Sequence, residues 1–209
     1  MRRKEEAVKN PSSGRAIARH YRNQCGWTRK EAKKVWKAQK GKGPPPSSRR
    51  AMNQAEQARW LAEALREPDV LALALAFALA TGLRVSELVA VKRSDFGATT
   101  FSVLGKGQKW REVPINAGVK LLLPHLPTRG WLFPGRANGH VAAATVEAAC
   151  RRIGERLPDL AWVTPHVLRH TYTTNEVNRC IDPADLKAAL GHNSVRTTWT
   201  YVSTIHDHA

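Results

Sequence analysis

The sequence predicts a mainly α-helical domain with a small antiparallel β-sheet, an α+β fold, and two observations support this. From residue 53 onward, apolar residues recur at helical spacing between plausible helix starts and stops. Residues 101–115 instead have the pattern of two short strands joined by a glycine-flanked turn. The 209 residues show no internal repeat and fit one domain with an appendage.

The helices can be placed from their caps. Asn53 and Glu56 have the spacing of a capping box, and Trp60 lies on the apolar face of the helix that they open. Pro68 opens a second helix, which stays apolar through residue 80 and ends at 81–82. Its apolar run, residues 70–80, is shorter than the roughly 20 residues that a bilayer requires, so it predicts a buried helix.

The remaining elements follow in order along the chain. A short helix is predicted at 86–91, and the two strands at 101–104 and 111–115. Further helices are expected near 117–123, 142–157, 165–179, 183–190 and 195–203.

Charge divides the chain into a basic arm (1–40), a Gly/Pro/Ser linker (41–49) and a body (50–209). The formal net charge is +17, and residues 1–50 hold 16 Lys/Arg against 3 Asp/Glu. Thr28 and Glu31 have capping-box spacing, so the arm is expected to form short helices or to be disordered without its partner. Such an arm indicates a polyanion partner, with nucleic acid first, an anionic membrane surface second, and a solubilising tail as a third reading.

Cysteine and histidine patterns indicate neither a disulfide framework nor a metal site. The three cysteines are odd in number and match no CxxC spacing, which predicts free buried thiols in a reducing compartment. His206 and His208 near the C-terminus are interpreted as solvated side chains. The basic start of the chain runs into Glu5 and Glu6 without an apolar stretch, so it does not resemble a signal peptide.

Three stretches have the composition of a phosphate-binding site. Pro165 suits the first turn of a helix and sets His166 and Arg169 three residues apart on one face, beside a helix N-terminus that favours anions. Arg84 follows the buried helix, with Glu87 three residues on. Lys106 occupies the tip of the predicted hairpin. Taken singly, these stretches are more often structural: a surface arginine with a packed histidine, an ordinary surface ion pair, and a solvated loop lysine.

A fourth stretch, LGHNSVRTTWTY, carries His192 and Tyr201 nine residues apart. On one unbroken helix nine residues turn through about 900°, which would point the two side chains in opposite directions. Asn193 and Ser194 can interrupt the helix, and Ser194 can cap a new one, so that the two side chains converge.

Together, TGLRVSEL, GKGQKWREVPI, TPHVLRHT, LGH and the following tyrosine closely resemble the catalytic domain of the tyrosine recombinases, the phage-integrase family. The resemblance covers about residues 50–203 and implies the tyrosine recombinase catalytic-domain fold. It implies a site-specific recombinase that cleaves and rejoins DNA strands through a 3′-phosphotyrosyl link, without ATP, metal or another cofactor.

The resemblance also implies residue roles. Tyr201 would be the nucleophile. Arg84, Arg169 and His192 would hold the non-bridging phosphate oxygens, and His166 would help to take the tyrosine proton. Lys106 would protonate the leaving 5′ oxygen. Glu87 would orient Arg84 or His166 from behind.

Two departures from the family pattern concern partners. Only about 50 residues precede the catalytic region, so the basic arm is interpreted either as a remnant of the usual N-terminal clamp domain or as a substitute for it, and few residues follow Tyr201. The expected DNA contacts are Arg29, Lys30, Lys33, Lys34, Lys37, Lys40, Lys42, Arg49, Arg50 and Lys109. The implied partners are double-stranded DNA, further copies forming a tetramer on two DNA sites, and an accessory DNA-bending protein, with no membrane. The expected setting is the nucleoid of a bacterial cytoplasm, with a bacterial, phage or plasmid gene.

Two other functions remain open from the sequence. One is a relaxing activity like that of type IB topoisomerases, which uses the same chemistry without strand exchange. The other is a DNA-binding regulator that keeps the fold and has lost recombination.

Overall fold

The computed structural model describes residues 19, 21–32, 50–105, 107–136 and 139–191. The chain forms two compact units. The larger comprises Ala51–Tyr172 and Ala189–Gly191, and the smaller comprises Met1–Arg50, Thr173–Ala188 and His192–Ala209. The smaller unit thus includes residues 173–188 as well as the arm.

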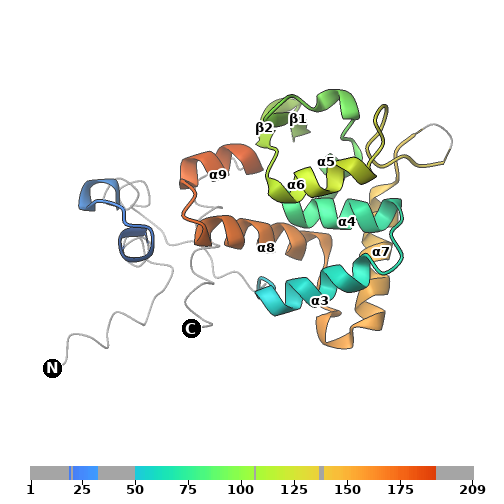
Figure 1. Ribbon diagram of the computed structural model, residues 1–209, viewed down its shortest axis with the longest axis horizontal. Helices are drawn as coiled ribbons and strands as arrows, with labels where there is room; N and C mark the ends of the chain where they lie inside the picture. Colours follow the sequence, from blue (N-terminus) through green and yellow to red (C-terminus); the bar gives the residue numbers. More distant parts are fainter. Residues whose placement is uncertain (1–18, 20, 33–49, 106, 137–138, 192–209) are drawn as a thin grey trace. The chain divides into compact units, whose positions relative to one another are not determined.

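The larger unit is helical apart from one hairpin, as the sequence predicts (Figure 1). Its elements run in the order α3 (Gln54–Ala64), α4 (Val70–Thr81), α5 (Val85–Val89), β1 (Thr100–Gly105), β2 (Lys109–Pro114), α6 (Ala117–Leu122) and α7 (Ala143–Arg156). Single 3-10 turns lie at Arg93–Asp95, Leu123–His125 and Pro158–Leu160. Along the chain, α8 (Pro165–Asn178) and α9 (Pro183–Leu190) follow. The part of α8 after Tyr172 and the part of α9 up to Ala188 belong to the smaller unit.

Local capping chemistry explains where the first helices begin and end. Asn53 and Glu56 form the predicted capping box, in which each side chain accepts the backbone N–H of the other residue at 2.8 and 2.9 Å. Helix α4 begins at Val70, two residues later than Pro68 indicates, because the Asp69 carboxylate caps the N–H groups of Leu71 and Ala72. Its C-cap is Gly82, in the left-handed conformation with φ +64°.

The two strands form an antiparallel hairpin whose register separates an inner and an outer face. Val103 pairs with Arg111 and Phe101 with Val113, while Leu104 pairs with Trp110. Phe101, Val103 and Val113 are buried, whereas Trp110 is exposed. Because side chains alternate along a strand, Arg111 lies on the same inner face as Val113.

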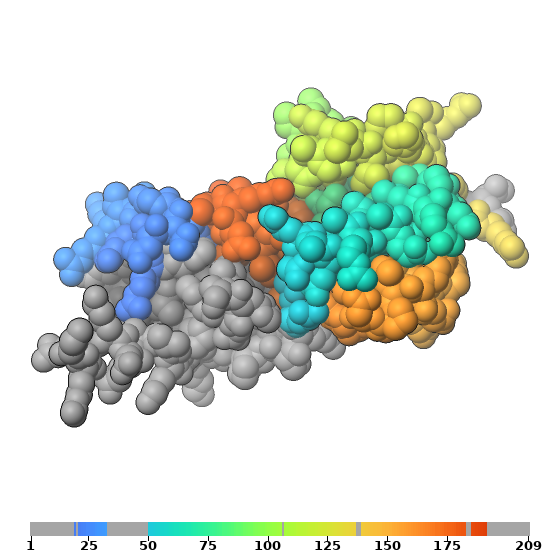
Figure 2. Space-filling model, turned by 60° about the horizontal axis from the view of Figure 1, so that its bottom comes forward, coloured from blue at the N-terminus to red at the C-terminus, as the bar shows by residue number. Residues whose placement is uncertain are grey.

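The core is centred on α4, which is apolar all round and packs against α3, α5, α6 and α7 (Figure 1). The fully buried Phe77 ring contacts the rings of Phe96, Phe101 and Phe133. In the space-filling view α4 fills the space between α6 and α7 (Figure 2). This explains why an apolar run too short to cross a membrane is so uniformly apolar.

The smaller unit corrects the cysteine prediction. Cys25 and Cys180, 155 residues apart in sequence, form a disulfide. Beside it the buried Tyr21 hydroxyl donates to the Ile181 carbonyl at 3.4 Å, and the Tyr21 ring packs on Trp27. The prediction of three free thiols failed because sequence spacing carries no information about contacts across such a distance.

The other elements agree closely with prediction. The Thr28–Glu31 capping box is present in the arm, with the Thr28 N–H and hydroxyl both donating to Glu31 at 2.7 Å. The helices expected at 117–123, 142–157, 165–179 and 183–190 are confirmed, and the one expected at 86–91 begins and ends one to two residues earlier. The helix expected at 195–203 lies outside the described residues. In the part of the chain that the structure describes, no helix is both long and apolar enough to cross a membrane.

Candidate active site

Arg84 is positioned by the turn between α4 and α5. Gly82 ends α4 in the left-handed conformation, and a Cβ at this position would overlap the ring of Tyr172. A glycine is therefore required both by the backbone angle and by the space available. Two residues later Arg84 forms the N-cap of α5, and its side chain remains 38% exposed.

Glu87 lies on the first turn of α5 and is the anionic centre of the site. Its side chain is only 4% exposed. One oxygen accepts the Arg84 guanidinium at 2.8 Å, and the other accepts the Arg84 backbone N–H at 3.0 Å. The carboxylate thus holds both ends of Arg84. This is the geometry expected of a residue that orients Arg84, although its role in a reaction remains a prediction.

The surroundings of Glu87 keep it ionised. Burial raises the pKa of this carboxyl, but hydrogen bonds from Arg111 and Arg84 and the charge of Arg111 outweigh burial, so the pKa lies below its ordinary value. A carboxylate that stays charged while buried can bind guanidinium groups far more strongly than it would at the surface.

Arg111 is the site residue that the sequence analysis missed. It extends from the inner face of β2, and its Nη1 and Nη2 donate to the two Glu87 oxygens at 3.1 and 2.7 Å. Its Nε donates to the Ala189 carbonyl at 2.8 Å. One signal was available: in KWREVPI an arginine occupies the buried alternation of a strand, where an apolar side chain would be expected.

Arg169 is the third arginine around this carboxylate. It lies on α8, is 4% exposed, and approaches Glu87 to 4.0 Å. Its Nη1 donates to the Gly82 carbonyl at 2.6 Å and its Nη2 to the Leu190 carbonyl at 2.8 Å. The structure therefore brings Arg84, Glu87 and Arg169 together from segments more than 80 residues apart, joining the end of α4 to the end of α9.

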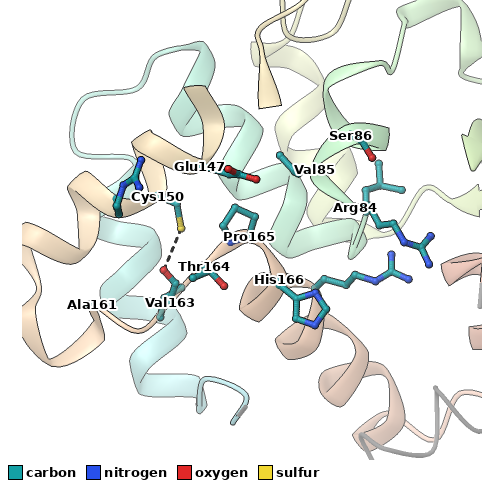
Figure 3. Close-up of a pocket in the computed structure, with 13 residues that line it drawn as sticks. Arg84, Val85, Ser86, Glu147, Cys150, Ala161, Val163, Thr164, Pro165 and His166 are labelled. Atoms are coloured by element: carbon teal, nitrogen blue, oxygen red, sulfur yellow. Dashed lines mark hydrogen bonds between the residues drawn. The ribbon is translucent and has the colours of Figure 1, made fainter. Parts of the chain in front are cut away.

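A cavity of about 500 Å³ opens beside these residues, lined in part by Arg84, His166 and Arg169. Figure 3 shows Arg84 and His166 reaching it from α5 and from the first turn of α8. Thr164 precedes α8, and its hydroxyl accepts the Val167 N–H at 3.3 Å. Two arginines and a histidine at a helix N-terminus form a surface that suits a phosphate group.

Cys150 lines another part of the cavity but has no chemical role there. Its thiol donates to the Val163 carbonyl (Figure 3), and burial raises its pKa to about 12. A thiol in that state is not a nucleophile near neutral pH. For this one cysteine the prediction of a free buried thiol is confirmed.

The remaining predicted residues divide into those the structure describes and those it does not. Arg29, Lys30, Arg50 and Lys109 are exposed. Lys106, His192 and Tyr201 lie outside the described residues, as do six predicted DNA contacts, namely Lys33, Lys34, Lys37, Lys40, Lys42 and Arg49.

Other aromatic and histidine side chains of the described residues are packed. His170 and Trp60 are buried, and Tyr172 packs on Gly82. Burial, and then the charge of Asp182, raises the pKa of Tyr21, which keeps it protonated. Among the described residues there is no group of His, Cys, Asp and Glu side chains that could hold a metal ion.

Comparison with known proteins shows the family of the chain. The family model "Phage integrase family" matches residues 51–208. The chain belongs to the phage integrase family. A curated relative, tyrosine recombinase XerC of Methylobacterium nodulans, is 36% identical over 143 residues, which cover 62% of this chain and 44% of the relative. The chain thus spans about half the length of the curated relatives that it matches.

Solved structures of integrase-family proteins have the same fold. The catalytic domain of bacteriophage HP1 integrase is 28% identical with a TM-score of 0.57, covering 74% of this chain and 88% of that one. XerH site-specific recombinase bound to difH substrate has a TM-score of 0.62 at 22% identity, covering 73% of this chain and 50% of that one. The predicted tyrosine recombinase catalytic-domain fold is therefore confirmed.

Proposed function

We propose that this chain is a site-specific DNA recombinase that cleaves and rejoins DNA strands through a covalent 3′-phosphotyrosyl intermediate. The observation that carries the proposal is the convergence of Arg84, Arg111 and Arg169 on Glu87, beside a cavity that His166 also lines. Positive charge concentrated in this way favours binding of a phosphodiester.

The reaction would occur in one exchange at phosphorus. The phenolic oxygen of Tyr201 forms a bond to the scissile phosphorus while the bond to the 5′ oxygen breaks. His166 helps to take the phenol proton, and Lys106 gives a proton to the departing 5′ oxygen. Reversal of these steps by another 5′-hydroxyl rejoins the strand, so no cofactor is consumed.

Arg84 and Arg169 would hold the non-bridging oxygens as charge develops, with His192 as a further donor. Donors already aimed at such an oxyanion typically contribute about 3–4 kcal/mol each to the transition state. Arg84 suits this role because Glu87 fixes one part of its guanidinium while the side chain stays 38% exposed.

Double-stranded DNA is the proposed substrate. The Tn1549 transposon integrase, a solved structure of the same fold, is in complex with circular intermediate DNA, which supports DNA as the ligand. The arm lysines and arginines, together with Lys109, would neutralise backbone phosphates. We further propose a tetramer on two DNA sites, an accessory DNA-bending protein, and action at the nucleoid of a bacterial, phage or plasmid host.

Covalent capture tests the proposal. The protein is incubated with fragments of its source DNA, including those flanking its own gene, and quenched in detergent; attached DNA is then sequenced. Tyr201→Phe should abolish the adduct and leave DNA binding unchanged. Adducts at one defined sequence support a recombinase, whereas adducts without site preference favour a relaxing activity. Salt-sensitive binding with no adduct, even with an added DNA-bending protein, would favour a regulator and contradict the proposal.

A further inference from the structure

Arg111 contacts three separate parts of the site at once. Its fork binds both oxygens of Glu87, which in turn holds Arg84. Its Nε binds the Ala189 carbonyl in the last turn of α9. All three guanidinium nitrogens therefore have acceptors inside the protein, and the side chain is only 10% exposed. With three of its five N–H donors used inside the protein and little surface exposed, Arg111 is poorly placed to bind DNA itself.

Two glycines show how closely the rest of the site is built around this guanidinium. A Cβ on Gly105 would lie 2.9 Å from Arg111 Nη1, and a Cβ on Gly191 would lie 3.1 Å from both its Cδ and its Nε. Gly191 also has φ +62°, which a glycine adopts readily. A Cβ at either position would therefore require the Arg111 side chain to shift.

The positions of these glycines in the chain connect Arg111 to the proposed chemistry. Gly105 directly precedes Lys106, and Gly191 directly precedes His192. Through Glu87 the same side chain also restrains Arg84. Arg111 thus contacts the backbone just before the proposed general acid and the backbone just before the proposed histidine donor to the phosphate. Through Glu87 it also reaches the arginine proposed to clamp the phosphate.

We propose that Arg111 is a positioning residue that holds Arg84 and the backbone at Gly105 and Gly191 in place for phosphoryl transfer, without touching the phosphate. The inference rests on the proposed function of the site. An arginine is required because its flat guanidinium presents two parallel N–H donors to the carboxylate while Nε reaches the carbonyl, whereas the three donors of a lysine diverge from one compact nitrogen.

The test compares Arg111→Met and Arg111→Lys with Arg59→Met as the matched control. Arg59 also forms a fork on a carboxylate, to Asp159 at 2.9 and 3.1 Å, but that pair lies at the surface, half exposed. We expect Arg111→Met to slow single-turnover adduct formation on the captured DNA site about 10- to 100-fold. DNA affinity should change less than about threefold, because the phosphate contacts lie elsewhere. Arg59→Met should match the wild type.

The pH profile separates positioning from loss of folded protein. Among the described residues, the charged groups facing Glu87 are Arg84 at the N-cap of α5, Arg111 from β2 and Arg169 from α8. Removing Arg111 should raise the pKa of Glu87, so the rate of Arg111→Met should fall on the acid side at a higher pH than in the wild type. Arg111→Lys keeps the charge, so it should show a smaller pH shift but still a slow reaction.

Three results would overturn the inference: an Arg111→Met rate equal to that of Arg59→Met, a slow rate with a pH profile superimposable on the wild-type one, or an Arg111→Lys rate equal to wild type.

If the wild type forms no Tyr201-dependent adduct, the proposed function fails instead. Arg111 is then tested with inorganic phosphate, followed by NMR of the arginine Nε–H signals. Phosphate should shift the Arg84 signal less in Arg111→Met than in Arg59→Met; equal shifts would refute positioning.

Discussion

Replacing Glu87 by glutamine would remove the only negative charge that the structure shows within 4.0 Å of Arg84, Arg111 and Arg169 among the described ion pairs. The amide keeps the volume but loses the charge. Removing one partner of a buried charge cluster typically costs about 3–5 kcal/mol. We therefore expect Glu87→Gln to lower the free energy of unfolding at pH 7 by about that amount. With an m-value of about 2 kcal/mol/M, the urea midpoint would fall by about 1.5–2.5 M.

The pH dependence of this stability difference shows whether the charge of Glu87 is its cause. The folded-state pKa of Glu87 lies below its ordinary value of 4.5, so its contribution is fully present above that value. It is lost as the pH falls through the folded-state pKa. The difference in stability between wild type and Glu87→Gln should therefore be constant from about pH 8 to pH 5 and shrink below pH 4.5.

The assay is urea unfolding by circular dichroism at several pH values. Glu112→Gln is the control, because hydrogen bonds from Ser102 and Thr100 lower the pKa of this carboxyl while it remains exposed. It should leave the urea midpoint nearly unchanged. A stability difference for Glu87→Gln that stays the same from pH 7 down to pH 3 would refute the reasoning, because the charge would then not be its source.

Three further predictions concern the turn before α5, the disulfide and the arm. Gly82→Ala is compared with Gly107→Ala as its control, because both glycines have a left-handed backbone but a Cβ on Gly107 meets nothing within 4 Å. Gly107→Ala should lower the free energy of unfolding by about 1–2 kcal/mol for the backbone alone. Gly82→Ala should lower it by about 1–3 kcal/mol more in thermal unfolding, because the added Cβ overlaps Tyr172; equal losses would contradict that packing. Reducing the Cys25–Cys180 disulfide should lower the free energy of unfolding by up to about 5 kcal/mol, from its 155-residue separation. Cys25→Ser should be insensitive to reductant, and three titratable thiols in the unreduced, denatured protein would disprove the bond. The last variant replaces four arm lysines, Lys33, Lys34, Lys37 and Lys40, by glutamine. The slope of log binding constant against log salt concentration for duplex DNA, measured by fluorescence anisotropy, should become less negative by up to about 3.6. An unchanged slope would exclude phosphate contacts from these lysines.

The helix caps and the hairpin could be predicted because their signals are local. Asn53 with Glu56, Thr28 with Glu31, and Gly82 each act on residues no more than four positions away, so the sequence alone contains both partners. The predicted start of α4 was wrong because two neighbouring residues can each begin a helix. Pro68 is compatible with the first turn of a helix, but the Asp69 side chain is the one that caps α4. Such errors of one or two residues leave the fold unchanged.

The site could be predicted only in part. Arg84, His166 and Arg169 were recognised as family motifs, and the structure brings all three to one cavity. Glu87 was expected to orient Arg84 or His166, and the structure shows its contact with Arg84. The roles of Lys106, His192 and Tyr201 remain predictions, because these residues lie outside the described part of the chain.

The sequence by itself determined the family, the helical fold with its hairpin, and the basic arm. These follow from patterns that span a few residues or from motifs recognised in order. Only the tertiary structure decided that Arg111 shares Glu87 with Arg84, and that Cys25 meets Cys180. The physical reason is that a buried charge or a thiol acquires its partner from whatever the packed core brings beside it. Arg111 lies 24 residues from Glu87 and 78 from Ala189, and no local pattern encodes contacts at such separations.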